Sequence, residues 1–300
     1  MNFAPIALFV YNRPYHLKKT LNSLKKNLEI KNTLIYVFSD GPKNNFQDIK
    51  NVKQVRKILK NVNFCKKKII IEKKKNIGLK KNILDGINHV FKRNKKIIVL
   101  EDDIVVNKYF LNFMNTGLKK YYKSKKIWHI SGWNYSINNK LDKNHSFFIK
   151  NMNCWGWGTW KDKWIKAKFN SNFYIKKFTK EKRYKFDLDN SFENYSQIFR
   201  NSQNKISTWA IFWNATIFFN DGLCLNPYKS LTMNIGQDKS GTNTINYQLK
   251  SNILNNLKIE NYPDQMVENK MARYEIITFL NRKRKKSKLS SLFKKIFRGV

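Results

Sequence analysis

The chain has 300 residues, and 41% of them are hydrophobic, which is enough for one large core and excludes a wholly disordered chain. No stretch approaches the roughly 20 apolar residues of a transmembrane helix, so we expect no membrane span and no signal peptide. The three cysteines, Cys65, Cys154 and Cys224, form no CxxC pair, which excludes common zinc spacings and favours a reducing compartment.

Basic residues outnumber acidic residues by 60 to 20, for a formal net charge of +40. The excess is scattered and consists mostly of lysine. A compositional bias towards Lys, Asn and Ile explains it without any function. The alternative is attraction for phosphorylated donors, membrane surfaces or lipid-linked acceptors, and we expect no nucleic-acid partner.

Short apolar runs alternate with helical patterns through the first half of the chain, which predicts βαβ units. The strand candidates are residues 5–11, 34–38, 68–71, 97–100 and 127–130. The helix candidates are residues 17–28, 52–59, 83–91 and 109–122. The predicted fold is therefore α/β, with a mostly parallel central sheet flanked by helices and a Rossmann-like nucleotide-binding half.

Aromatic residues dominate beyond about residue 145, and the regular alternation fades. Here the sequence predicts a helix over 178–201, a buried helix over 209–219 and a loop over 226–244. We expect a nucleotide-sugar-binding half at 1–145 and an aromatic-rich acceptor and lid half at 146–280. Residues 281–300 complete the chain as a basic amphipathic tail.

Each strand of the predicted parallel sheet ends on polar residues, and ligands bind beyond such ends. The ends carry Asn12 and Arg13, then Asp40, then residues 73–76, and finally the triplet at residues 101–103. Four polar strand ends at one edge predict a cleft for an anionic, hydrogen-bonding ligand.

The triplet Glu101-Asp102-Asp103 is the sharpest feature of the sequence. Adjacent carboxylates repel one another unless a cation shares them, and a hard divalent ion prefers oxygen ligands and substrate phosphates. The triplet therefore predicts an Mn²⁺ or Mg²⁺ site. The alternative is an acidic loop that caps the next helix.

Other phosphate-binding motifs are missing from the sequence. It contains no GxxxxGK[ST] loop and no GxGxxG after the first strand, which disfavours a P-loop enzyme or a nicotinamide cofactor.

Two further candidates have ordinary structural alternatives. Asp40 lies in a Ser-Asp-Gly-Pro segment, whose residues are also typical of a β-turn. Lys80 opens a helix where a phosphate could bind, although a lone lysine means little in so basic a chain.

The segments PIALFVYNRP, SDGP, NIGLKKNILDGI and VLEDDI resemble nucleotide-sugar glycosyltransferases of the GT-A fold. They are most similar to the N-acetylglucosaminyltransferase I group and its bacterial relatives, which also carry Glu-Asp-Asp. The resemblance continues through ISGWN at 130–134, the aromatic segment 154–160 and the stretch 227–242, and it covers roughly residues 4–245.

The resemblance implies roles for the matching positions. Asp103, with Glu101, would hold the divalent metal, and Asp102 would contact the ribose, the sugar or metal-bound water. Gly241 and Thr242 would close over the diphosphate as part of a mobile loop. The donor-binding candidates are Tyr11, Asn12, Arg13, Asp40, Asn76, Lys80, Glu101, Asp102, Gly241 and Thr242.

Two departures from the family's pattern concern catalysis. Asn243 stands where relatives often carry His, and Ala210 stands where they may carry an Asp that acts as base. Asp162 is then the first candidate base and Asp238 the second, each with an ordinary surface carboxylate as the alternative. Asp102 is a further catalytic candidate.

Three tryptophans of the aromatic segment have two interpretations. Trp155, Trp157 and Trp160 would stack on an acceptor sugar, or they would pack in the core.

The resemblance implies a metal-dependent, inverting hexosyl- or N-acetylhexosaminyl-transferase that uses a UDP-sugar and a glycan or lipid-linked acceptor in bacterial surface polysaccharide synthesis. We expect a cytoplasmic enzyme whose tail, 281–300, docks on an anionic membrane surface at the inner face. A nucleic-acid-binding or disordered tail is the alternative. The rival functions are a non-catalytic basic binding module and a degenerate transferase.

Overall fold

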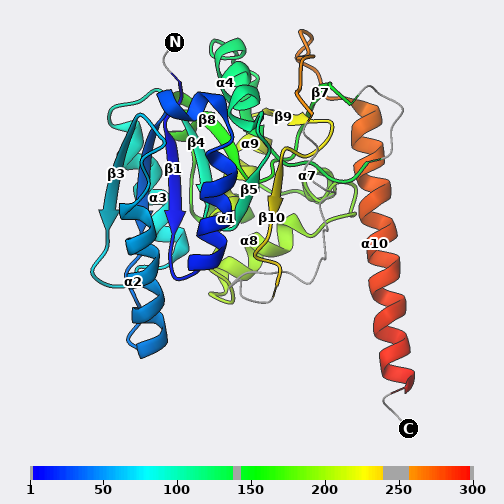
Figure 1. Cartoon of the computed structure of the whole chain (residues 1–300). Helices are drawn as coiled ribbons and strands as arrows, with labels where there is room; N and C mark the ends of the chain where they lie inside the picture. Colours follow the sequence, from blue (N-terminus) through cyan, green and yellow to red (C-terminus); the bar gives the residue numbers. More distant parts are fainter. Residues whose placement is uncertain (1–2, 138–142, 239–256, 298–300) are drawn as a thin grey trace.

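The computed structural model describes residues 3–137, 143–238 and 257–297, with side chains to residue 284. Within them eight strands form one central sheet in the order β3-β2-β1-β4-β8-β6-β9-β7, with helices on both faces (Figure 1). A small antiparallel ribbon of β10 and β5 lies beside it. The predicted α/β fold with a mostly parallel central sheet is confirmed.

The first half of the chain alternates strand and helix as predicted. Its elements are β1 (Ile6–Val10), α1 (Pro14–Leu24), a 3₁₀ turn (Leu28–Asn32), β2 (Leu34–Ser39), α2 (Phe46–Lys60), β3 (Lys67–Glu72), α3 (Leu79–Phe91) and β4 (Lys96–Glu101). β1 is fully buried and pairs in parallel with β2 and β4, which explains its continuous apolar sequence.

The second half adds strands from distant parts of the chain. Its elements are β5 (Ile104–Val106), α4 (Phe110–Lys120), β6 (Ile127–Ser131), β7 (Ser146–Ile149), β8 (Trp157–Trp160), α5 (Lys161–Trp164), α6 (Ser171–Ile175), α7 (Lys180–Phe186), α8 (Asn194–Ser202), α9 (Ala210–Phe219), β9 (Leu223–Pro227), β10 (Thr232–Asn234) and α10 (Lys270–Phe297).

Strand β8 runs antiparallel to both of its neighbours, β4 and β6. Trp160 therefore pairs with Lys96, the first residue of β4, whereas Trp157 pairs with Val99 near the other end. Residues that follow β8 leave the sheet at the edge where β4 begins. This direction decides below which predicted residues can reach the acidic triplet.

Two apolar clusters cover the two faces of the sheet. Alternate residues of β1 divide between them, because Leu8 packs with α1, α2 and α4 while Phe9 packs with α3 and the tryptophans. On the second face Trp157 stacks on Trp209 at 5.3 Å and on His129 at 5.2 Å between ring centroids. The aromatic residues of the second half therefore lie largely in the core.

Three segments differ from the sequence prediction. The helix expected over 178–201 is two helices, α7 and α8, because Leu188, Asp189 and Asn190 adopt positive φ and turn the chain between them. The loop expected over 226–244 contains β10, and residues 239–256 lie outside the described part. The described part of the tail, residues 281–297, belongs to α10, which begins already at Lys270 and projects beyond the body of the molecule (Figure 1).

None of the described helices combines the length and apolar character needed to cross a bilayer.

Candidate active site

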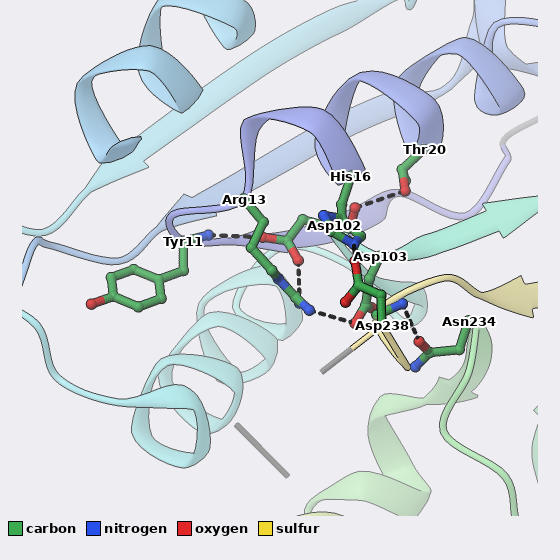
Figure 2. Close-up of polar contacts among 9 residues, drawn as sticks. Tyr11, Arg13, His16, Thr20, Asp102, Asp103, Asn234 and Asp238 are labelled. Atoms are coloured by element: carbon green, nitrogen blue, oxygen red, sulfur yellow. Dashed lines mark hydrogen bonds and ion pairs between the residues drawn. The ribbon is translucent and has the colours of Figure 1, made fainter. Parts of the chain in front are cut away.

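The acidic triplet lies where β4 ends, next to the end of β1. Phe9 pairs with Glu101 in the parallel register, which brings the residues after β1 beside those after β4. Arg13, at the start of α1, donates through one terminal nitrogen to Asp102 at 2.5 Å and through the other to Asp103 at 2.9 Å (Figure 2). The structure therefore brings Arg13 and two acids of the predicted cleft into direct contact.

Asp102 is held on several sides by the first strand and helix. Its carboxylate accepts from the Tyr11 backbone N–H at 3.1 Å, and its carbonyl accepts from the Thr20 hydroxyl at 2.8 Å. The side chain is only 3% exposed. Such anchoring fixes Asp102 in place and leaves it little freedom to bind a metal by itself.

The cluster has more negative charge than the single cation can balance. Burial, with the charges of Asp103 and Asp102, raises the pKa of Glu101 to about 8. Burial also raises the pKa of Asp102 to about 6, although the Arg13 charge counteracts this. Burial alone would lower the pKa of Arg13, but Asp102 and Asp103 offset it and raise this pKa above its ordinary value.

Asp103 has unused bonding capacity. Its Oδ1 is buried and has no hydrogen-bond partner among the described residues. The backbone of Gly236 packs so closely that a Cβ there would clash with Asp103 and Arg13. The Ile235 N–H donates to the Asp103 carbonyl at 2.9 Å, so the segment after β10 forms one wall of the site.

These residues fit a divalent cation that a ligand helps to hold. The described residues contain no group of three or more His, Cys, Asp or Glu arranged to bind a metal. Mg²⁺ commonly uses only one or two carboxylates together with substrate phosphates. The open oxygen of Asp103 and the half-buried carboxylate of Glu101 suit such a partial site.

Asp40 organises the loop before α3. Its Oδ1 accepts from the N–H groups of Gly41 and Ile77, and its Oδ2 accepts from the Gly78 N–H and the Asn76 amide, at 2.8 to 3.2 Å. With four bonds accepted and 3% exposure, Asp40 positions the start of α3. Direct contact of Asp40 or Asn76 with a donor stays a prediction.

Asp48 is a site residue that the sequence reasoning missed. Its carboxylate accepts from the Tyr11 hydroxyl, the Asn12 amide and the Lys43 N–H, each at 2.5 Å. Burial would raise the pKa of Asp48, but these bonds lower it. Asp48 thus orients both predicted donor-binding side chains after β1. Its position in the first turn of α2 made it look like an ordinary helix-start acid.

Lys80 lies in the first turn of α3, and its ammonium group sits 4.8 Å from the centroid of the Phe212 ring. Burial lowers its pKa. A cation–π contact of this kind holds Lys80 near α9. Its binding of a donor phosphate stays a prediction.

The two candidate bases lie at opposite edges of the sheet. Asp162 follows β8 and therefore lies at the edge where β4 begins, where it pairs with Lys163 at 2.9 Å. The six residues of β4 separate the two edges by about 17 Å, so the structure contradicts Asp162 as the base. Asp238 lies beside the triplet, its carboxylate 3.0 Å from His16 Nε2 (Figure 2).

The three tryptophans do not share one environment. Trp157 and Trp160 are 0% and 1% exposed, and the Trp160 indole donates to the Leu118 carbonyl. They pack in the core, so an acceptor contact for these two is wrong. Trp155 is half-buried and packs edge-on to Trp133 with centroids 4.8 Å apart. Gly241 and Thr242 lie outside the described residues.

No family model matches the chain, and no curated protein matches it. Solved structures with partial similarity include a fragment of TarS from S. aureus, at 11% identity and a TM-score of 0.43, over 78% of this chain and 61% of that one. An active-site mutant of LgtC matches at 10% identity and a TM-score of 0.40, over 71% of this chain and 70% of that one. A longer TarS structure matches at 15% identity and a TM-score of 0.29, over 47% of this chain and 24% of that one.

The chain thus spans less than two thirds of either TarS structure. At these TM-scores the likeness carries no argument of its own about function. The residues that indicate a function are the acids at the end of β4, Arg13 and residues 235–238, which form one wall of the site.

Proposed function

We propose that the chain is a glycosyltransferase that moves a sugar from a nucleoside diphosphate, UDP, to a hydroxyl of an acceptor. One observation carries the proposal. Three carboxylates lie at the carboxyl end of β4, one of them has an open buried oxygen, and Arg13 alone contacts two of them, which leaves an excess of negative charge. A ligand that brings both a divalent cation and phosphates would satisfy this cluster.

Asp103, with Glu101, would hold Mn²⁺ or Mg²⁺, which when bound neutralises charge on the leaving diphosphate. Arg13 spans Asp102 and Asp103, and it orients both carboxylates. Asp48 holds the Tyr11 hydroxyl and the Asn12 amide at the mouth of the same cleft. The proposed donor pocket therefore lies between the ends of β1 and β4.

Asp238 is the proposed general base. It comes from the segment that walls the triplet, and its side chain is half-exposed, so an acceptor hydroxyl can reach it. The carboxylate accepts the hydroxyl proton as the hydroxyl oxygen bonds to the anomeric carbon, and the bond from that carbon to the diphosphate breaks. Attack from the side opposite the leaving group inverts the anomeric centre.

A panel of nucleotide-sugar donors tests the proposal directly. Thermal unfolding of the chain is followed with UDP-, GDP- and CDP-sugars, each in the presence of Mn²⁺ and in the presence of EDTA. One donor at a hundred times its dissociation constant should add about 2.7 kcal/mol of stability, with Mn²⁺ only. If no nucleotide-sugar stabilises the chain under either condition, the transferase proposal fails.

A lipid-linked or polymeric acceptor at an anionic membrane surface is the second part of the proposal. The supporting observation is the formal charge of +40, together with the basic sequence of residues 281–300, of which residues 281–297 form the last part of α10. A chain truncated after residue 280 should lose binding to phosphatidylglycerol vesicles and keep transfer to a soluble acceptor. Unchanged flotation of the truncated chain with vesicles contradicts this part.

A further inference from the structure

A cavity opens at the edge of the sheet opposite the acidic triplet. It has a volume of about 410 Å³ and lies where β1 and β4 begin and where α4 ends. Its lining includes Arg93, Lys95 and Lys96 from the turn into β4, and Lys119 from the end of α4. The length of β4 separates this cavity from Glu101 by about 17 Å, so it is not part of the candidate active site.

The charge of this cavity is not balanced by the protein. Its lining contains no acidic residue. Within the described part of the chain, none of its four cations forms an ion pair, and Asp162, at the same edge, pairs with Lys163. These four cations therefore have room for an anionic ligand.

Helix ends explain only part of the charge. The helices α3 and α4 end beside the cavity, and each carboxyl end carries roughly half a negative charge. Two ends offset about one of the four positive charges, which leaves about three. Lys96 is half-buried, and burial together with the charge of Lys119 lowers its pKa. A bound anion would relieve this repulsion.

The other walls indicate what kind of anion fits. Phe3, Pro5 and Tyr122 provide an apolar side, and Tyr122 is 44% exposed. The volume lies within the roughly 300–1,000 Å³ typical of small-molecule sites. Arginine and lysine together are the residues that most often bind phosphate oxygens. We propose that this basic cavity is a second binding site, for a phosphate-bearing ligand with at least two negative charges.

The test uses two exposed cations of the cavity, so that folding is not at risk. Arg93→Gln with Lys119→Gln is compared with a control of equal charge change, Lys50→Gln with Lys57→Gln on α2. Pyrophosphate binding is measured by calorimetry in EDTA and about 0.15 M salt, which removes metal-dependent binding and screens exposed charges. Flotation with phosphatidylglycerol vesicles, against phosphatidylcholine, tests a lipid phosphate.

We expect the cavity variant to weaken at least one probe tenfold or more relative to the α2 variant. Loss of pyrophosphate binding identifies a soluble phosphate compound as the ligand, and loss of vesicle binding alone identifies a lipid headgroup. If both variants bind both probes equally, or the unmodified chain binds neither probe saturably, the second site is refuted. Neither result depends on the transferase proposal.

Discussion

Removing Arg13 should destabilise the protein in a strongly pH-dependent way. In Arg13→Gln the carboxylates of Asp102 and Asp103, 3% and 10% exposed, lose the cation that contacts both. Breaking a buried ion pair commonly costs about 3–5 kcal/mol. Because Asp103 is partly exposed, we expect about 3 kcal/mol at pH 8.

The sign of the pH effect follows from the carboxylates. Even beside Arg13, burial raises the pKa of Asp102 from its ordinary value of 3.8 to about 6. Without Arg13 the folded state holds protons more tightly still, so stability falls as pH rises from about 4 through this raised pKa. At pH 5 the Asp102 carboxylate takes up a proton, and the loss should shrink to about 1 kcal/mol.

The assay is urea unfolding followed by tryptophan fluorescence at pH 5 and pH 8. Arg56→Gln is the matched control, because Arg56 donates to the carbonyls of Asp40 and Lys73 and only weakly pairs with Glu72. Its loss should be about 1 kcal/mol at both pH values. Equal losses at pH 5 and pH 8 for Arg13→Gln would refute the charge balance inferred for the triplet.

Three further predictions concern the acids. Stability of the unmodified chain should fall as pH rises from about 5 to 9, because the pKa of Glu101, about 8, exceeds its ordinary value of 4.5. In Glu101→Gln the unfolding temperature should depend less on pH over this range. Asp238→Asn should lower sugar transfer at least about 100-fold and leave donor affinity within about twofold, and loss of donor binding would contradict the role of base. Asp162→Asn should change neither quantity by more than about twofold in the same assays, because it lies at the opposite edge.

The first four strands, β1 to β4, were predictable because each contains a continuous apolar run. Residues 5–11, for example, contain β1, and its burial on both faces leaves no polar position in the strand. The polar strand ends then follow from the rule that parallel strands share one carboxyl edge. The position of Arg13 beside the triplet is therefore predictable from the sequence alone.

The direction of β8 could not be predicted in this way. Trp157–Trp160 is only four residues long, and nothing in them specifies that the strand inserts antiparallel between β4 and β6. Pairing between segments about 60 residues apart in sequence decides it. Asp162 was ranked before Asp238 as the base for this reason, although the two lie at opposite edges.

The roles of Asp40 and Asp48 also depend on distant partners. Asp40 accepts from residues 36 to 38 positions away, and Asp48 accepts from Tyr11 and Asn12 at 37 and 36 positions. From the local sequence, Asp40 is a typical turn residue and Asp48 is a typical acid in the first turn of a helix. Only the fold shows that Asp40 positions the start of α3 and that Asp48 positions the residues after β1.

Calorimetric titration of UDP in the presence of Mn²⁺ tests the central claim most directly. Asp103→Asn keeps the shape of the side chain and removes the charge, and Asp264→Asn, at a 90% exposed carboxylate, is the control. We predict that Asp103→Asn weakens UDP binding at least about 100-fold, while the control and the unmodified chain bind alike. Binding of UDP to Asp103→Asn within a few-fold of the control would contradict the account.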